Sequence, residues 1–447
     1  MEYLDEILHD HSFNIQLKSQ QKECLAHLLN GTNVFAMLPT GFGKSLIYTL
    51  FPLIQKKMTG SRKTSLVVSP LRALMIDQVI RLEKHDVKAA YMTKDTPPGM
   101  MEDIKKGFVD IIFLSPEMLR SVKIDVLKCH QSQISLLVFD ECHCISEWGL
   151  DFRPDYRKVS DIVSLFSDIP TLLLSATATM SVQNDLYNLL ALDEENTRVV
   201  AKLPDRPNVF IHVEQQPCSQ NHEIQLQWII NMVSELQSTT PKTIVYCQNL
   251  RQCETLYIWL MEELESLAYL NGVVNIKNRM IEMYHSRTDE SSMHRILSDF
   301  KNSESTIKII FATVAFGLGI DIPNISIVVC WGVSSSAMTF WQELGRCARN
   351  GSDGYTYTYP YARSLSLCSD KKMKDLIKEK GCLRNHILSL FILDGMDEDL
   401  PTSSACDVNE CDVCKCQMCR CCSNCKMKCC CKGKDLVNHL TKYHTTS

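Results

Sequence analysis

LLVFDECHCISEWGLDFRPDY, residues 136–156, is the stretch that decides the fold of this chain. It opens with a short apolar run, 137–139, which is typical of a buried strand, and the run ends in two adjacent carboxylates, Asp140 and Glu141. Neighbouring side chains of a strand point to opposite faces of the sheet. The alternative interpretation of the two carboxylates is therefore a strand edge that is exposed to solvent. Unpaired charge at the end of a buried strand is costly, and this cost favours carboxylates that bind a cation.

A second apolar run, Phe35 to Leu38, leads into a glycine-rich loop. The loop consists of Pro39, Thr40, Gly41, Phe42, Gly43, Lys44 and Ser45. Its glycines allow a tight turn that points backbone N–H groups at phosphate oxygens, and a helix starting near Ser45 turns its positive dipole end to the same anion. Lys44 adds a positive charge at the β- and γ-phosphates, and the hydroxyl of Ser45 serves the metal. Leu38 replaces the first glycine of the strict pattern GxxxxGK[ST].

The loop and the acidic strand end together predict a site that hydrolyses a nucleoside triphosphate. Alone, such a loop is also an ordinary connection between a strand and a helix. With the carboxylates beside it, we expect Ser45 and Asp140 to bind Mg²⁺, Asp140 through water. We expect Glu141 to be the base that orients the attacking water.

Length and composition set the class of protein. A chain of 447 residues has room for two or three domains, and 45% apolar residues is ordinary for a soluble globular protein. No apolar stretch reaches the roughly 18 residues of a membrane helix, and the first residues are too acidic for a signal or transit peptide. With a net charge of −5, any nucleic acid must bind local basic patches.

The 22 cysteines fall into two groups. Ten are scattered before residue 370, which suits a reducing compartment. The other twelve lie between Cys382 and Cys431, and this density indicates metal binding rather than disulfides.

Strand-like apolar runs alternate with helical stretches, which predicts layered α/β domains with parallel sheets. A connector with two prolines, 202–210, separates two series of such runs, so we expect two similar α/β lobes with the nucleotide between them. From about residue 366 the chain becomes helical and basic, and then rich in cysteine. The expected strands are 34–38, 64–69, 110–115, 135–140 and 171–176 in the first series and 243–247, 307–312 and 325–330 in the second.

Further motifs make the chain similar to the RecQ-type DNA helicases of superfamily 2 over residues 13–415. The resemblance rests on the order and spacing of VVSPLRALMIDQV (67–79), FLSPEML (113–119), CHCISEWGLDFRPDY (142–156), LSATAT (174–179), DRPN (205–208), FATVAFGLGIDIPN (311–324) and WQELGRCARNG (341–351). It implies two RecA-like lobes, 1–203 and 204–365, then a small helical zinc-binding module, 366–415, and a cysteine-rich basic tail, 416–447. It also implies ATP- and Mg²⁺-dependent movement 3′ to 5′ along single-stranded DNA, with unwinding of duplexes.

The aromatic-rich loop after the carboxylates implies DNA contacts. Trp148 and Phe152 offer flat faces for unstacked bases, and Arg153 offers a charge for a backbone phosphate. Core packing is the alternative for one Trp and one Phe in a loop, but their position directly after the carboxylates favours DNA. The predicted DNA-binding residues are Trp148, Phe152, Arg153, Ser69 and Pro70.

Gln342, Arg346 and Arg349 are spaced at i, i+4 and i+7, so a helix would present them on one face. The resemblance implies that they reach the γ-phosphate and stabilise charge in the transition state. A solvated helix face is the alternative. Ala348 replaces a glycine of the family, a change that we expect the helix to tolerate.

Lys18 and Gln21 align with the motif that binds adenine in the family. A Gln amide can bond N6 and N7 of adenine bidentately, whereas Lys18 stands in for an arginine and lacks its planar stacking. The resemblance also implies that Asp321 contacts the ribose. ATP is therefore the expected nucleotide.

The cysteine-rich end predicts zinc. The resemblance gives Cys382 as the first ligand and Cys406, Cys411 and Cys414 as the other three, and four thiolates suit tetrahedral Zn²⁺. Unliganded surface thiols are the alternative. Eight more cysteines, at 416–431, could bind a second Zn²⁺, form a metal cluster or belong to a disordered tail.

These observations lead to an ATP-dependent DNA helicase as the expected function. A DNA-stimulated translocase or annealing factor that scarcely unwinds is one alternative, and a non-catalytic nucleic-acid-binding zinc protein is another. We expect no winged-helix or HRDC domain beyond the zinc module. DNA as the substrate leads us to expect the nucleus.

Overall fold

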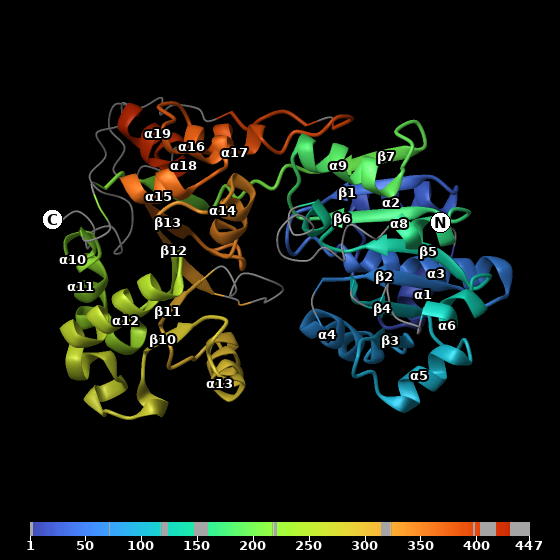
Figure 1. Cartoon of the computed structure of the whole chain (residues 1–447), viewed down its shortest axis with the longest axis horizontal. Helices are drawn as coiled ribbons and strands as arrows, with labels where there is room; N and C mark the ends of the chain where they lie inside the picture. The colour runs from blue at the N-terminus through green and yellow to red at the C-terminus, as the bar shows by residue number, and fades with distance from the viewer. Residues whose placement is uncertain are drawn as a thin grey trace. The chain divides into compact units, whose positions relative to one another are not determined.

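The computed structural model describes two compact units (Figure 1). Unit 1 consists of Met1–Pro204 and Phe391–Asp399, and unit 2 of Asp205–Leu390 and Leu400–Ser447. The domain boundaries expected from the sequence stay predictions. The residues that the structure describes are 3–70, 72–116, 118, 124–146, 160–216, 218, 221–313, 322, 324–396, 398–402 and 417–429.

Unit 1 is built on a seven-stranded sheet in the order β3-β4-β2-β5-β6-β1-β7, in which every neighbouring pair is parallel. Strands β2, β4, β5 and β6 are buried along their whole length, as expected for a parallel sheet covered on both faces. The strands are β1 (Asn33–Met37), β2 (Thr64–Val68), β3 (Ala89–Met92), β4 (Ile111–Leu114), β5 (Ile134–Phe139), β6 (Thr171–Ser175) and β7 (Thr197–Ala201).

The helices of unit 1 connect these strands. Helix α3 is buried from Ile47 to Ile54 and ends at Thr59, where Gly60 caps it with a left-handed backbone (φ 70°). The described helices are α1 (Leu4–Asp10), α2 (Ser19–Leu29), α3 (Ser45–Thr59), α4 (Arg72–Glu83), α5 (Pro98–Lys105), α6 (Ile124–Cys129), α8 (Ser160–Leu165) and α9 (Met180–Leu190).

The strand order of unit 1 gathers the predicted motifs at one edge of the sheet. Strands β1 and β5 are separated only by β6, and parallel strands all end at the same edge. The glycine-rich loop after β1, the carboxylates after β5 and Ser175 at the end of β6 therefore lie at that edge.

Unit 2 is built on a six-stranded parallel sheet in the order β10-β11-β9-β12-β13-β8. Its strands are β8 (Val209–Val213), β9 (Lys242–Cys247), β10 (Ile281–Tyr284), β11 (Ile309–Ala312), β12 (Ile325–Trp331) and β13 (Gly354–Tyr359). Its described α-helices are α10 (His222–Gln225), α11 (Gln227–Leu236), α12 (Leu250–Leu264), α13 (Glu290–Lys301), α14 (Ala337–Leu344), α15 (Ala362–Leu367), α16 (Lys371–Ile377), α17 (Leu383–Ser389), α18 (Gln417–Cys421) and α19 (Ser423–Lys428). Short 3₁₀ helices lie at Gln237–Thr239, Glu265–Ala268, Leu270–Gly272 and Ile276–Asn278.

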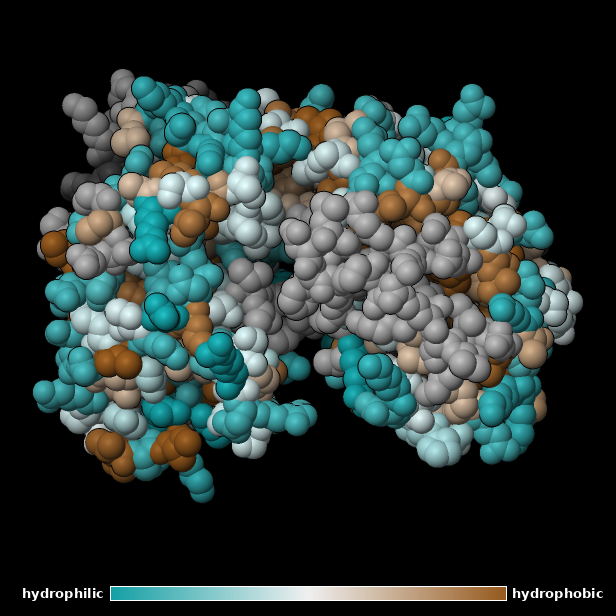
Figure 2. All heavy atoms as spheres, in the orientation of Figure 1, coloured by the Kyte–Doolittle hydropathy of each residue, from teal (hydrophilic) through white to brown (hydrophobic). Residues whose placement is uncertain are grey.

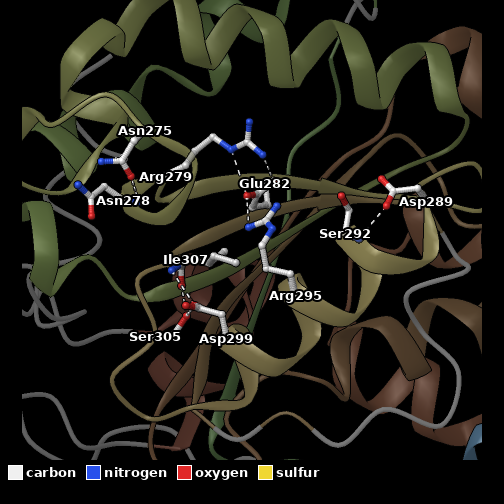
Figure 3. A network of polar contacts seen from close by, with 10 residues as sticks. All are labelled: Asn275, Asn278, Arg279, Glu282, Asp289, Ser292, Arg295, Asp299, Ser305 and Ile307. Atoms are coloured by element: carbon white, nitrogen blue, oxygen red, sulfur yellow. Dashed lines mark hydrogen bonds and ion pairs between the residues drawn. The ribbon is translucent and has the colours of Figure 1, made fainter.

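A buried ion pair fastens the edge strand β10 to helix α13 (Figure 3). Glu282 on β10 is 3% exposed, and its carboxylate accepts hydrogen bonds from Arg279 at 3.1 and 2.7 Å. Arg295 on α13 lies 2.8 Å from the same carboxylate. Asp289 caps the start of the helix, because its side chain accepts from the backbone N–H of Ser292.

The predicted fold class is confirmed, since both series of predicted strands form parallel sheets. The sequence missed β3, β7, β10 and β13. It was also wrong about the end of the connector, because Val209 and Phe210 are the first residues of β8.

Polar side chains dominate the face drawn in Figure 2, with apolar residues scattered among them. Within the part of the chain that the structure describes, none of the helices combines the length and apolarity that crossing a membrane requires.

Candidate nucleotide site and cysteine cluster

The glycine-rich loop joins β1 to α3 and has the geometry of a phosphate-binding turn. Gly41 and Gly43 both have left-handed backbones, with φ 78° and φ 86°, which glycine adopts without strain. Helix α3 begins at Ser45, so its first N–H groups border the loop. The side chain of Lys44 donates to the carbonyl of Leu38 at 3.0 Å. The structure therefore brings together the predicted residues 39–45 in one turn.

Two residues at the start of α2 contact this loop from outside. The amide of Gln21 donates to the carbonyls of Phe42 at 3.0 Å and of Gly43 at 2.9 Å. The ammonium of Lys18 lies 4.0 Å from the centre of the Phe42 ring and donates to the Phe42 carbonyl at 3.3 Å. Both residues lie at the phosphate loop, beside the site for which the sequence predicted them.

Asp140 and Glu141 lie at the end of β5, at the same sheet edge as the loop. Asp140 is partly buried. Its loss of hydration and the nearby charge of Glu141 raise its pKa to about 7, while the charge of Lys44 opposes this shift. Glu141 has a left-handed backbone, φ 48°, so the chain turns directly after Asp140. This turn ends the strand alternation that would send the two carboxylates to opposite faces.

His143 links the carboxylates to the end of β6, a role that the sequence prediction did not assign. Its Nδ1 lies 2.9 Å from the hydroxyl of Ser175 and 3.6 Å from the carboxylate of Glu141. Ser175 in turn donates to the carbonyl of Thr177 at 2.5 Å. Burial lowers the pKa of His143 and keeps the ring neutral. The spacing D-E-x-H in the opening stretch is the sequence signal that could have identified it.

In unit 2, Gln342 lies on α14, but the helix ends at Leu344. The prediction of one continuous helix through Arg346 and Arg349 is therefore wrong. The reason is local: Gly345 caps the helix, and Ala348 has a left-handed backbone, φ 51°, that no helix continues through.

The arginine-bearing turn after α14 is held by the DRPN segment. The guanidinium of Arg206 donates to the carbonyls of Gly345, Cys347 and Ala348 at 3.1, 2.8 and 2.7 Å. Asn208 adds a bond to the carbonyl of Ala348 at 3.1 Å. These bonds fix the backbone of the turn that follows α14.

Four cysteines of unit 2 form a compact cluster, and only one of them was in the predicted zinc site. The sulfur atoms of Cys382, Cys421, Cys422 and Cys425 all lie within 4.8 Å of one another. Those of Cys382 and Cys421 are 3.5 Å apart, too far for a disulfide. Four thiolates bound tetrahedrally to one Zn²⁺ at about 2.3 Å lie about 3.8 Å apart, so these side chains fit that metal.

The local structure explains how residues far apart in the chain reach this cluster. Cys382 caps α17, where its sulfur accepts from the backbone N–H of Asn385 at 3.4 Å. Arg384 in the first turn of α17 is 4% exposed and donates to Asp205 at 2.8 Å, to the carbonyl of Arg206 at 2.6 Å and to the carbonyl of Cys421 at 3.3 Å. The structure thus groups Cys382 with cysteines that the sequence analysis left in the tail.

The remaining predicted residues divide into two sets. Ser69 and Pro70, at the end of β2, are both buried, and Ser69 is 1% exposed. The others lie outside the described residues, and their roles stay predictions: Trp148, Phe152, Arg153, Asp321, Cys406, Cys411 and Cys414.

Comparison with known families agrees with this geometry. Residues 18–186 match the DEAD/DEAH box helicase model, and residues 225–351 match the helicase conserved C-terminal domain. A solved structure with the same fold is the helicase MrfA bound to DNA and AMPPNP, with a TM-score of 0.64 and 18% identity over 81% of this chain and 50% of that one.

Several curated relatives are RecQ-like or other helicases. ATP-dependent DNA helicase Q-like 2 of Arabidopsis thaliana is 32% identical over 76% of this chain and 47% of its own length. The probable ATP-dependent DNA helicase RecS of Bacillus subtilis is 33% identical over 75% of this chain and 62% of its length. A putative ATP-dependent RNA helicase of Acanthamoeba polyphaga mimivirus is 28% identical over 94% of this chain and 71% of its length.

The chain thus spans about half to two thirds of the length of the two DNA helicases that it matches. Its phosphate loop and its paired carboxylates lie in the first matched range, and each range contains most strands of one of the two parallel sheets. Residues 18–186 thus form a DEAD/DEAH box helicase core and residues 225–351 a helicase conserved C-terminal domain, and the relatives of the chain include RecQ-like DNA helicases.

Proposed function

We propose that this chain is an ATP- and Mg²⁺-dependent DNA helicase of the RecQ type, which moves 3′ to 5′ along single-stranded DNA and separates duplexes. The observation that carries the proposal is the meeting of the Lys44 loop with Asp140 and Glu141 at one sheet edge. The relatives that are DNA helicases support the choice of nucleic acid and of family.

The proposed chemistry assigns a separate task to each group. Backbone N–H groups of residues 41–45 and the ammonium of Lys44 bind the phosphates. Ser45 and Asp140 would hold Mg²⁺, which supplies positive charge to the phosphate oxygens. Glu141 orients the attacking water and accepts its proton. Arg346 and Arg349 stabilise the negative charge that develops on the transferred phosphoryl group.

His143 and Ser175 supply a physical link between hydrolysis and the end of β6. The Nδ1 atom of His143 lies 2.9 Å from the hydroxyl of Ser175 and 3.6 Å from the carboxylate of Glu141. A change in the charge around Glu141 therefore acts directly on the segment that starts at Ser175. We propose that this link passes the state of the nucleotide to the DNA-binding loops.

Nucleic-acid binding is assigned to the aromatic-rich loop of residues 142–156. Trp148 and Phe152 would stack on bases, and Arg153 would bind phosphate. An RNA helicase is the second candidate, because the relative that matches 94% of this chain is named as a putative RNA helicase.

The cysteine cluster completes the proposal. We propose that Cys382, Cys421, Cys422 and Cys425 bind one Zn²⁺, since the four sulfur atoms already lie at distances that suit tetrahedral thiolate ligation. The metal would be structural, because four protein ligands leave no position for a substrate.

The test is ATP hydrolysis and strand separation by the purified chain. Hydrolysis is measured alone, with single-stranded DNA and with single-stranded RNA of the same sequence, and unwinding is measured on duplexes with a 3′ or a 5′ tail. We expect stimulation by DNA and unwinding of the 3′-tailed duplex alone. Stimulation by RNA only would favour the second candidate, and stimulation without unwinding would indicate a translocase.

A Lys44→Ala variant supplies the control for the active site. We expect it to lose at least roughly 100-fold in hydrolysis, because the charge at the β- and γ-phosphates is gone, while DNA binding persists. Unchanged hydrolysis in this variant would remove the site from the proposal.

A further inference from the structure

A cavity of about 790 Å³ in unit 1 lies where β5 and β6 begin, at the edge of the sheet opposite to the nucleotide site. Gln55 and Thr59, in the last turns of α3, line one part of it. Ser135 in β5 and Pro170 directly before β6 line another part. Ser135 comes five residues before Asp140, which is about 16 Å along an extended strand, so the cavity is separate from the paired carboxylates.

Two buried polar atoms on the walls of this cavity have no hydrogen-bond partner among the described residues. They are the hydroxyl oxygen of Ser135, a residue that is 7% exposed, and the side-chain carbonyl oxygen of Gln55. Buried polar groups are nearly always paired in proteins, because an unpaired one costs free energy. A molecule that reaches both atoms recovers this cost. It must bring a hydrogen-bond donor, because the carbonyl oxygen of Gln55 can only accept.

The charges on the walls favour an anion. Lys63 and Lys128 line the cavity, and Asp168 is the single acidic residue among its described walls. The ammonium of Lys63 donates to the carbonyl of Ser132 at 3.3 Å, a bond that uses one of its three hydrogens. Lysine ammoniums commonly bind phosphate groups in proteins. The two lysines therefore suit a ligand that carries a phosphate.

Apolar surface completes the cavity. Ile134 and Phe166 line it, and both are 2% exposed. Ligand sites in proteins combine such apolar walls with a few polar groups that orient the ligand. From these walls we propose that the cavity binds a small sugar phosphate, whose phosphate lies at the two lysines and whose hydroxyls bond Ser135 and Gln55. The apolar surface packs against the C–H face of the sugar ring.

The first experiment titrates ribose 5-phosphate into the full chain and follows binding by ligand-observed NMR. We expect a Kd of about 1 mM or tighter, with the same value in the presence of Mg²⁺ and AMPPNP and in the Lys44→Ala variant. Ribose alone and inorganic phosphate alone should bind at least roughly 10-fold more weakly, because each leaves part of the walls without contacts.

Three results would overturn the proposal and leave the proposed helicase function intact. The first is no binding of ribose 5-phosphate. The second is inorganic phosphate bound as tightly as the sugar phosphate, which would indicate an adventitious ion only. The third is binding that Lys44→Ala abolishes, which would place the probe in the phosphate loop.

A Ser135→Ala variant tests the unpaired hydroxyl. It should weaken the binding of ribose 5-phosphate by roughly 5- to 10-fold, because one hydrogen bond to the ligand is lost. The melting temperature should stay the same or rise, since alanine has no side-chain polar atom to bury. Ser167→Ala is the matched control, because Ser167 is an exposed serine that bonds Asp168 and does not line the cavity. An unchanged Kd in Ser135→Ala would overturn the proposal.

Lys63 provides a second pair of variants in case Ser135→Ala does not fold. Lys63→Met removes a charge from the walls and should weaken binding by roughly 10-fold, whereas Lys63→Arg keeps a cation and should keep most of the affinity. Lys56→Met is the control, because Lys56 is an exposed lysine of α3 that does not line the cavity. An equal loss in Lys63→Met and Lys56→Met would show only an effect of net charge and would contradict the proposal.

Discussion

Glu141 shows what a single residue adds to the pattern around it. The sequence predicted both carboxylates and their place after a buried strand, because residue type and the apolar run are visible there. It did not predict the left-handed backbone of Glu141, φ 48°, since packing imposes that angle. Such a backbone costs a non-glycine residue roughly 1–3 kcal/mol, so it persists only where the surroundings hold it.

The second buried carboxyl group of interest is Glu343, and its pKa leads to a pH-dependent prediction. Glu343 on α14 is 5% exposed, and burial raises its pKa from 4.5 to about 7, although the hydroxyl of Ser334 at 2.5 Å opposes the shift. Between these values the folded state holds a proton that the unfolded chain releases. Stability is therefore lost as the pH rises through this window, by about 3 kcal/mol in total.

Glu343→Gln is expected to remove that loss. The variant should be more stable than the parent chain by about 2–3 kcal/mol near pH 8. Near pH 4.5 the two chains should have similar stability. Urea unfolding at several pH values measures the difference, with the exposed Glu262→Gln as the control. A stability difference between Glu343→Gln and the parent chain that is the same at every pH would contradict the raised pKa of Glu343.

At the scale of elements, a charged residue inside β10 explains why the sequence analysis missed this strand. Strand β10 has the sequence IEMY, and the buried Glu282 in its second position interrupts the apolar run that would mark it. The sequence GYTYTY of β13 is buried at every position, although half of it is polar or glycine. Continuous apolar runs such as β5 and β6 were found because nothing interrupts them.

Glu282→Gln is expected to destabilise unit 2 by about 2 kcal/mol. Removing one partner of a buried ion pair costs roughly 3–5 kcal/mol, and the guanidiniums here are 24% and 32% exposed, which reduces the effect. Thermal unfolding followed by circular dichroism measures the change. Glu290→Gln, in the exposed first turn of α13, is the control, and an equal shift in both variants would show that the ion pair contributes nothing specific.

At the scale of the whole chain, the cysteine cluster marks the limit of prediction from sequence. Twelve cysteines lie between residues 382 and 431, and spacing alone cannot decide which of them meet in space. The structure groups Cys382 with three residues about forty positions later, because α17, α18 and α19 bring them together. The sequence predicted a cysteine site that includes Cys382, but it did not group Cys382 with Cys421, Cys422 and Cys425.

Removal of zinc is expected to destabilise unit 2 far more than unit 1. Metal binding at a structural thiolate site contributes on the order of 10 kcal/mol, and Arg384 ties the cluster to Asp205 and Arg206. Cys425→Ser or a strong chelator should lower the melting temperature and release one Zn²⁺ per chain. Cys129→Ser, an exposed cysteine of unit 1, should do neither. Full zinc content in Cys425→Ser would assign the metal to other cysteines.

The return of residues 391–399 to unit 1 decides how this protein can be divided into fragments. The backbone N–H of Leu203 bonds the carboxylate of Glu398, that of Asp394 approaches the sulfur of Met180 at 3.1 Å, and Gly395 lies against Val199. The polypeptide therefore passes from one unit to the other three times. A fragment that stops at Pro204 lacks a peptide of its own fold, so studies of the isolated first unit need that nonapeptide added back, fused or in trans.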